Sequence, residues 1–397
     1  MKNMENFDQC VISDICGGCL YQGVPYEEQL VLKNNEIFRL LDKHNVDTSV
    51  YEGLVPALSC YRYRNKMEYT FGDLEKDGEM TLGMHRKGHF MSIVTSDMCQ
   101  LVPEDFNIIL RAVLDFSADN GYAFCNKKSH IGLLRNLIVR HGVKTGEILV
   151  NIVTTSEDGF DEEAFVALLR GLDLDNELVG IVRTFNDSLA DAVIDQGTKI
   201  LYGRDYYDEI ILGLRFKVSA FSFFQTNIEA VERLYSDALE FIPEIGEKIV
   251  YDLYCGTGTI SQLMAMKAKK VYGIEIVEDS VEAARANALL NDIHNCEFIA
   301  GDVKAKLEEL TEKPDLIVVD PPRVGMHDKV VDMLAGYGVR EILYISCNPK
   351  TMCLNLEKFR EYGYVPVKIR AYDNFPMTKH AECICLLTQT PRDSMTL

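Results

Sequence analysis

The sequence predicts an α/β protein that combines a Rossmann-like domain, built on a parallel sheet, with a central α+β domain. After Gly246, short all-apolar strand patterns at 249–253, 271–275 and 316–319 alternate with helical patterns at 259–267 and 279–291. Such alternation is typical of a parallel sheet that helices cover on both faces. Between about 54 and 221 the apolar residues instead recur at every second position, and helical patterns at 103–120 and 161–172 interrupt them. This pattern indicates an α+β domain.

Length and composition bound the class of protein. The chain of 397 residues is too long for one core, and its 47% hydrophobic and 26% charged residues are those of an ordinary soluble protein. No apolar run approaches the ~20 residues of a membrane span, and the first ten residues lack the core of a signal peptide. We therefore expect a cytoplasmic protein without membrane contact. In that reducing compartment, twelve cysteines favour ligand or catalytic roles, or burial, over disulfides.

Three cysteines, Cys10, Cys16 and Cys19, lie close together at the start of the chain, and two glycines separate the last two. The candidate for a fourth ligand is Cys99, in a turn-like segment after a strand pattern. Four thiolates suit either a tetrahedral zinc ion or a cubane iron–sulfur cluster, and the spacing does not choose between them. An unstructured terminus with unliganded cysteines is disfavoured because exposed thiols are reactive.

The next segment, 26–44, has the pattern of an amphipathic helix. Leu30, Ile37 and Leu40 lie on its apolar side, and Lys33 lies on the opposite side, which we expect to face solvent.

Basic residues gather in the central domain although the formal net charge is -20. An acidic average argues against a strongly basic nucleic-acid binder, but binding requires only a local basic face. Both a solvated strand face and a phosphate-binding surface fit the pattern. The basic runs are Arg62, Arg64 and Lys66, then His85, Arg86, Lys87 and His89, then Lys127, Lys128, Arg135, Arg140 and Lys144.

A glycine-rich turn connects the first strand and helix of the Rossmann-like domain. Its sequence from Asp252 onward contains Tyr254, Gly256, Gly258 and Thr259. Glycines at such a turn let a ligand approach the backbone closely, and the turn lacks the third glycine of the dinucleotide fingerprint.

Acidic residues stand near the carboxyl ends of successive strands. Glu275 is placed for ribose hydroxyls, Asp302 follows the next strand where an adenine edge would lie, and Asp320 ends the strand after that. Together with Asp252 they predict a nucleoside crevice that suits S-adenosylmethionine better than NAD. Each acid alone could instead cap a helix.

Cys347 stands between a strand pattern at 342–344 and a helical pattern that opens with Asn348 and Pro349. Asn is a good N-cap and Pro suits the first helical position. A thiol just outside a helix N-terminus should ionise easily, so we interpret Cys347 as a nucleophile. The alternative is a small buried hydrophobic residue. Downstream, His380 or Glu382 precedes the final strand pattern at 383–387 and could act as a base.

Two adjacent aromatic residues, Phe223 and Phe224, precede Gln225 and a helical pattern that ends near 241. Adjacent aromatics are usually part of a core, but one exposed ring could stack on a nucleobase.

Taken together, these residues resemble the RNA uracil-5-methyltransferase family, close to its ribosomal-RNA branch, over residues 10–387. The resemblance implies a class I methyltransferase domain and two discontinuous domains. One comprises 1–21 and 55–222, and the catalytic one comprises 22–54 and 223–397. The motifs that carry the resemblance are the spaced cysteines with Cys99, then 223–225, 252–259, 320–323, 346–349 and 375–382.

The resemblance also implies roles for individual residues. It implies a [4Fe-4S] cluster held by the four cysteines 10, 16, 19 and 99, and S-adenosylmethionine in the glycine-rich crevice. Phe223 would stack on a flipped uracil, and Gln225 would bridge cofactor and base. Asp320 would contact the cofactor or the base edge, with Arg323 beside it, and Glu382 would be the general base.

The activity implied is methylation of carbon 5 of a uridine in 23S ribosomal RNA through a covalent Cys347–uracil intermediate. Two alternatives remain, namely a methyltransferase for the thymidine-loop uridine of transfer RNA and a non-catalytic iron–sulfur RNA-binding or assembly factor. Many relatives carry an N-terminal oligonucleotide-binding barrel, whereas nine residues precede Cys10 here. We therefore expect the central domain to capture the RNA, and no obligate protein partner is implied.

Overall fold

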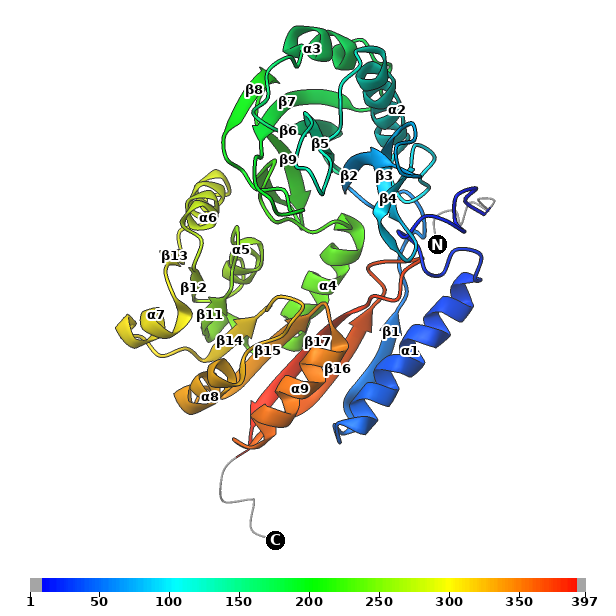
Figure 1. Ribbon diagram of the computed structural model, residues 1–397. Helices are drawn as coiled ribbons and strands as arrows, with labels where there is room; N and C mark the ends of the chain where they lie inside the picture. The colour runs from blue at the N-terminus through cyan, green and yellow to red at the C-terminus, as the bar shows by residue number, and fades with distance from the viewer. Residues whose placement is uncertain (1–8, 391–397) are drawn as a thin grey trace. The chain divides into compact units, whose positions relative to one another are not determined.

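The computed structural model describes residues 9–390 and divides the chain into two compact units, each made of separate stretches of sequence (Figure 1). The first unit contains the described residues up to Gly23 together with Ser59–Ile210 and Lys217–Ile228. The second contains Val24–Leu58, Ile211–Phe216 and the residues from Glu229 onward. Among the described residues, no helix combines the length and the apolar character that a membrane span requires.

The first unit is built on a seven-stranded sheet in the order β4-β3-β2-β5-β6-β7-β8. Neighbouring strands are antiparallel except β6 and β7, which are parallel and are connected through α3 (Glu162–Arg170). Apolar side chains of α2 (Glu104–Asp119) and α3 form one core with the sheet. The strands are β2 (Lys66–Asp73), β3 (Met80–Arg86), β4 (His89–Thr95), β5 (Leu134–Gly142), β6 (Glu147–Thr154), β7 (Glu177–Phe185) and β8 (Thr198–Gly203).

The two-residue periodicity and both helices of this unit are confirmed. The strand β8 was not predicted, because most of its side chains are exposed and it therefore lacks an apolar alternation. A separate hairpin of β9 (Tyr206–Ile211) and β10 (Leu214–Ser219) follows.

The second unit contains an eight-stranded sheet in the order β1-β16-β17-β15-β14-β11-β12-β13. All neighbours are parallel except β17, which runs antiparallel to both β15 and β16. The short central strands are fully buried, which confirms the parallel sheet predicted from all-apolar runs. The strands are β1 (Tyr51–Val55), β11 (Ile249–Leu253), β12 (Lys270–Glu275), β13 (Cys296–Ala300), β14 (Leu316–Val319), β15 (Glu341–Ser346), β16 (Tyr364–Tyr372) and β17 (Glu382–Gln389).

Helices pack on both faces of this sheet, as Figure 1 shows. One core joins the sheet to α1 (Tyr26–Lys43), α7 (Val303–Glu309), α8 (Asp328–Tyr337) and α9 (Pro349–Arg360). On the other face, α6 (Glu278–Leu290) packs on Phe298 of β13. The remaining helices are α4 (Ile228–Phe241) and α5 (Thr259–Ala265).

The side of α1 that carries Lys33 is not exposed, contrary to the prediction. Lys33 is buried, and its Nζ lies 2.6 Å from Oδ1 of Asp373. One turn earlier, Gln29 is buried as well and accepts a hydrogen bond of 2.9 Å from the backbone N–H of Met377. The loop between β16 and β17 therefore covers this side of α1, which amphipathicity alone could not reveal.

Several domain boundaries also differ from the prediction. Residues 55–58 and 211–216 belong to the second unit, and residues 22–23 belong to the first. Residues 223–228, which the sequence assigned to the catalytic domain, also belong to the first unit. Hydrogen bonds attach them there: Asn65 donates its backbone N–H to the carbonyl of Thr226 at 3.0 Å and its side-chain amide to the carbonyl of Gln225 at 3.2 Å.

Candidate active site

The glycine-rich turn between β11 and α5 has a strained, left-handed backbone. Tyr254, Gly256 and Gly258 have φ angles of 66°, 53° and 75°. A side chain at position 258 would place its Cβ 2.6 Å from a ring carbon of Phe298, so only glycine lets the turn pack this closely on β13. Thr259 begins α5 directly afterwards. Residues 254–256 of this turn are half-buried and nothing lies within 4 Å of a Cβ built at Gly256, so a ligand could approach the backbone there.

Glu275 connects the turn to the end of β12. Its Oε2 accepts a hydrogen bond of 3.1 Å from the N–H of Gly256, and its Oε1 accepts bonds of 2.8 and 3.0 Å from the N–H groups of Ile276 and Val277. A carboxylate has about four lone-pair sites, of which these bonds use three, so one site at Oε2 is left for a ribose hydroxyl. The exposed apolar side chains of Ile276 and Val277 offer an adenine ring a surface beside it. A hydrogen-bond acceptor for a ribose next to an apolar surface for a base fits a nucleoside.

The other two acids on this side of the sheet differ in accessibility. Asp302 is exposed, but one of its oxygens caps α7 by accepting a 3.1 Å bond from the N–H of Ala305, so the capping alternative applies to it in part. Asp252 is fully buried and accepts a hydrogen bond from the hydroxyl of Ser261. Burial raises the pKa of Asp252 to about 7. Asp252 stands at the end of its strand, as the sequence indicates, but its buried carboxyl offers a ligand no exposed oxygen.

Cys347 lies directly after β15 and before α9, as predicted. Asn348 caps the helix by accepting a 3.2 Å bond from the N–H of Lys350, and its side-chain amide donates to the carbonyl of Arg323 at 2.9 Å. Thr351 also donates its hydroxyl to that carbonyl, at 3.3 Å. These bonds hold the loop after β14 against the loop after β15. This contact of Thr351 was not predicted from the sequence, because the only sequence signal for it is the position of Thr351 in the first turn of a helix.

Strand pairing brings Glu382 next to Cys347. Cys383 of β17 pairs with Ser346 of β15, so Glu382 and Cys347 are the residues immediately beyond that antiparallel pair. The Glu382 side chain is buried, whereas Cys347 and Asp320 are half-buried and Arg323 is exposed. The candidate nucleophile and the candidate base therefore meet at one edge of the sheet.

The thiol of Cys347 does not ionise easily, contrary to the prediction. Burial raises its pKa to about 11, and the neighbouring carboxyls of Glu382 and Asp320 add to the rise. Arg323 opposes the rise through its charge and a hydrogen bond. The dipole of the helix N-terminus is a smaller effect than the loss of hydration and two like charges.

The two carboxyls are also perturbed. Burial raises the pKa of Glu382 to about 8, with Asp320 adding to the rise and Arg323 opposing it. Burial raises the pKa of Asp320 to about 7. Perturbed acids of this kind cluster at functional sites, and their interaction with Cys347 favours Glu382 over His380 as a base.

Phe223 and Gln225 belong to the first unit. The Phe223 ring is 74% exposed and the adjacent Phe224 is buried, so one ring is available for stacking and the other is part of the core. Their contacts to a substrate stay predictions.

The four cysteines of the proposed cluster all lie in the first unit. The loop that carries Cys16 and Cys19 is attached to the β3–β4 hairpin, because Gly17 donates to the carbonyl of His85 at 2.9 Å and Lys87 donates to that of Ile15 at 2.7 Å. A side-chain bond of 2.8 Å joins Gln22 to Gln100, which are near Cys19 and Cys99 in the sequence.

The thiols influence one another. Burial is the main reason why the pKa of Cys16, Cys19 and Cys99 is raised, and the other thiols of the four, Cys10 included, raise it further. Within residues 9–390, no group of three or more histidine, cysteine or acidic side chains is arranged to hold a metal ion.

Residues 160–390 match the family described as tRNA (uracil-5-)-methyltransferase. A curated protein of Clostridium tetani, named as an RNA methyltransferase, is 46% identical over 376 residues, which are 95% of this chain and 82% of that protein. A curated protein of Clostridium acetobutylicum with the same description is 46% identical over 379 residues, which are 96% of this chain and 83% of that protein. A curated RNA methyltransferase of Bacteroides thetaiotaomicron is 34% identical over 398 residues, and the match covers 95% of this chain and 87% of that protein.

Among solved structures, the fold is similar to that of a Pyrococcus abyssi tRNA (uracil-54, C5)-methyltransferase in complex with S-adenosyl-L-homocysteine. The TM-score is 0.76 and the sequence identity 26%, with 94% of this chain and 86% of that one covered.

Proposed function

Because this chain belongs to the tRNA (uracil-5-)-methyltransferase family, a family of S-adenosylmethionine-dependent RNA methyltransferases, we propose that it methylates carbon 5 of a uridine in 23S ribosomal RNA with Cys347 as covalent nucleophile. The observation that supports this most directly is the cluster of Cys347, Glu382, Asp320 and Arg323. It lies at the carboxyl ends of β14 and β15, the edge at which open α/β sheets bind ligands. In this proposal the second unit is catalytic and the first captures the RNA.

The cofactor site is the turn at 254–259 with Glu275, Asp302 and Asp320. S-adenosylmethionine supplies an electrophilic methyl group on a positively charged sulfur. The left-handed glycines leave the backbone open, the Glu275 carboxylate accepts from ribose hydroxyls, and Asp302 keeps one oxygen for the adenine edge. Gln225 remains our proposed contact between cofactor and base.

Activation of the uracil falls to Cys347. Carbon 5 of uracil is too weak a nucleophile to take a methyl group by itself. The thiol proton passes to the neighbouring carboxylate of Asp320, which leaves Glu382 without that proton for the later step, and the sulfur adds to carbon 6. The addition moves the electron pair of the ring's carbon 5–carbon 6 double bond into an enolate. Carbon 5 of the enolate would then bond to the methyl group as the bond between that group and the sulfonium sulfur breaks, and the sulfur would keep the electron pair as a neutral thioether. Arg323 assists because it lowers the pKa of the thiol, and Phe223 would stack on the uracil.

Glu382 completes the reaction as general base. It removes the proton from carbon 5, the double bond between carbons 5 and 6 re-forms, and the sulfur leaves as thiolate. A buried carboxylate with a pKa of about 8 holds a proton tightly once it has accepted it, which suits this step.

We also propose that Cys10, Cys16, Cys19 and Cys99 hold a [4Fe-4S] cluster. The thiols are close enough to raise one another's pKa, although they do not converge on a position for one ion. A cubane is larger than an ion, so its four thiolates need not converge on one point. Anaerobic purification should yield a brown protein whose iron content falls in Cys16→Ser, and a colourless zinc protein would refute the cluster.

A second candidate substrate is the uridine of transfer RNA. The description of the matched family and of the Pyrococcus abyssi enzyme favours it. The four cysteines favour ribosomal RNA instead, because by resemblance the transfer-RNA branch often lacks such a cluster. A cytoplasmic location fits either substrate. A non-catalytic iron–sulfur factor has no use for Cys347 beside Glu382, which argues against that alternative.

Two experiments test the proposal. Mapping 5-methyluridine in ribosomal and transfer RNA from cells that lack the protein should show a loss of the modification in 23S ribosomal RNA. A loss confined to transfer RNA would select the second candidate. RNA that contains 5-fluorouridine should form a covalent adduct with protein and cofactor, because carbon 5 then carries no removable proton. Absence of the adduct would contradict nucleophilic attack by Cys347.

A further inference from the structure

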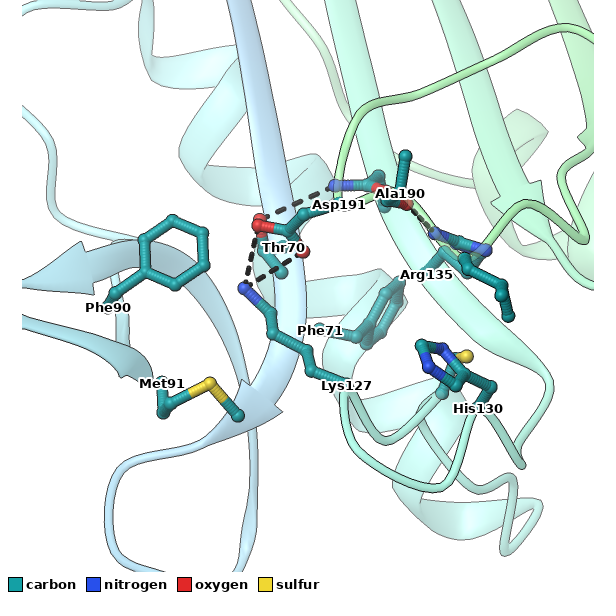
Figure 2. A pocket seen from close by; sticks show the side chains of 12 residues that line it. Thr70, Phe71, Phe90, Met91, Lys127, His130, Arg135, Ala190 and Asp191 are labelled. Carbon is teal, nitrogen blue, oxygen red and sulfur yellow. Dashed lines mark hydrogen bonds and ion pairs between the residues drawn. The ribbon is translucent and has the colours of Figure 1, made fainter.

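A cavity of about 200 Å³ opens in the first unit, and none of the residues that line it is assigned to the reaction (Figure 2). Its walls come from β4, from the segment 125–136 and from the loop 189–191. Ligand pockets for drug-sized molecules are roughly 300–1,000 Å³. The volume here suits one flat ring system.

Exposed apolar side chains surround this cavity. Phe90 is 61% exposed and Leu189 is 74% exposed, and Met91 beside them is exposed as well. Single exposed apolar residues need no explanation, but a group of them around one opening indicates an interaction site. The group contains an aromatic ring, which favours a stacking partner.

The ring of Phe90 is held in place before any ligand arrives. His85 stacks on it with 4.6 Å between ring centroids and 9° between ring planes. A ring nitrogen of His85 is also 2.7 Å from the backbone carbonyl of Phe90. Burial and the nearby Lys127 lower the pKa of His85, so the stacked imidazole is neutral at pH 7. A fixed aromatic surface costs a ligand little ordering entropy.

The opposite wall is fixed as well. The guanidinium of Arg135 donates to the backbone carbonyls of Asn186, Ser188 and Ala190 at 2.8, 2.7 and 2.7 Å. These three bonds hold the loop that carries Leu189. The cavity is therefore a built feature of the first unit.

Positive charge lies over the aromatic ring. Lys127 Nζ is 4.3 Å from the centroid of the Phe90 ring and 3.0 Å from Asp191. Figure 2 shows Lys127 reaching toward both. The Lys127 side chain is 18% exposed and that of Asp191 is 41% exposed, so the ion pair is only partly open to solvent, and an RNA phosphate would have to replace Asp191 as the partner of Lys127. Exposed Lys128 follows in the same loop, so a phosphate that passes the cavity would meet a second cation.

We propose that this cavity binds one unpaired nucleobase of the RNA substrate, distinct from the uridine that is methylated. His85 stacks on the Phe90 ring and Lys127 Nζ lies over it. The base therefore takes the place of Lys127 over the ring, and Lys127 turns from Phe90 and Asp191 to an adjacent phosphate. The combination of an aromatic platform and neighbouring cations is that of single-strand RNA recognition, and a base in a duplex would be covered by its neighbours. The inference rests on the proposed function in one respect, that the substrate is RNA.

Phe90→Ala tests the stacking contact. The probe is a short fluorescein-labelled single-stranded RNA, and a duplex of the same length serves as comparison. We expect single-strand affinity to fall roughly five- to 150-fold, because stacking on one aromatic side chain contributes about that much per base. Duplex affinity should change little, Phe90→Tyr should bind like the unmodified protein, and the affinity for S-adenosylmethionine should stay unchanged.

Phe38→Ala is the matched control, because Phe38 is an exposed phenylalanine on α1 of the second unit. It should leave RNA affinity unchanged. Lys127→Ala should weaken RNA binding. It should also reduce the slope of log affinity against log salt concentration by about 1, the change expected when one phosphate contact is lost. In methylation assays Phe90→Ala should raise the KM for RNA and leave kcat unchanged.

Equal single-strand affinities for Phe90→Ala and the unmodified protein would overturn the inference, and so would equal losses for both RNA forms. The two proposals fail differently. If the unmodified protein methylates RNA but Phe90→Ala has the same KM, only the nucleobase cavity is wrong. If Phe90-dependent binding is found without methylation of any RNA, only the proposed activity is wrong.

Discussion

The buried ion pair of Lys33 and Asp373 allows a quantitative prediction. The two side chains are 1% and 0% exposed, and Lys33 Nζ also donates to the carbonyl of Phe375 at 3.1 Å. Lys33→Ala would leave the carboxylate of Asp373 buried with its main cationic partner removed. Breaking such a pair on one side costs about 3–5 kcal/mol, so the free energy of unfolding at pH 7 should fall by that amount.

The loss should depend on pH, and its sign follows from Asp373. Burial raises the pKa of Asp373 above the ordinary value, and Lys33 opposes the rise. Without Lys33 the pKa of this acid rises further. A group whose pKa is raised in the folded state contributes stability at low pH and loses it as pH rises through the folded-state value. The deficit of Lys33→Ala should therefore shrink between pH 7 and pH 5.

Urea unfolding at both pH values measures these quantities. Lys43→Ala is the control, because Lys43 is an exposed lysine in the last turn of the same helix. It should change the free energy of unfolding by no more than about 0.5 kcal/mol. The double variant with Lys33→Met and Asp373→Leu should lose less than the two single variants added together. If Lys33→Ala destabilises the protein no more than Lys43→Ala does, the reasoning about the buried pair is wrong.

Three further predictions concern the candidate active site. Cys347→Ala should lower methylation by at least about 10³-fold and leave cofactor affinity, measured by calorimetry, nearly intact; loss of both would indicate a structural role. Because the pKa of Glu382 is raised to about 8, kcat should increase between pH 7 and pH 9 as this base ionises. Arg323 lowers that pKa, so Arg323→Ala should move the inflection of the pH profile to higher pH. A flat pH profile would contradict Glu382 as the base. Gly258→Ala should lower the free energy of unfolding, measured with urea, by about 1–3 kcal/mol and should weaken cofactor binding. Gly336→Ala is the control, because nothing lies within 4 Å of its new Cβ, and it should leave the free energy of unfolding unchanged or raise it. Equal effects of the two substitutions would argue against a steric role for Gly258.

The sequence predicts the centre of the second unit better than its edges. The strands β11, β12 and β14 are short and apolar because the sheet is buried on both faces, and that pattern can be read without knowledge of the fold. The N-cap at Asn348 is likewise a local signal. The edge strand β1 pairs with β16, more than 300 residues later in the chain, and no local pattern announces such a partner.

The chemistry of individual side chains was harder to predict than their positions. Cys347 and Glu382 lie together, but the direction of the thiol's pKa shift depends on burial and on two carboxyls that only the fold brings near. The same holds for Lys33, whose helical position indicates solvent until the loop that carries Asp373 covers it. Such effects arise from tertiary contacts between distant segments, which periodicity does not encode.

The reversed direction of β17 also determines where the chain leaves this unit. The strand begins with Glu382 at the reactive edge and runs through eight residues to Gln389. At a rise of about 3.4 Å per residue, its last residue lies roughly 24 Å from its first, at the far edge of the sheet. Affinity tags, fluorophores or surface-immobilisation handles added after residue 397 are therefore attached to a strand whose end points away from the chemistry, whereas insertions in the loop that precedes Glu382 would disturb it.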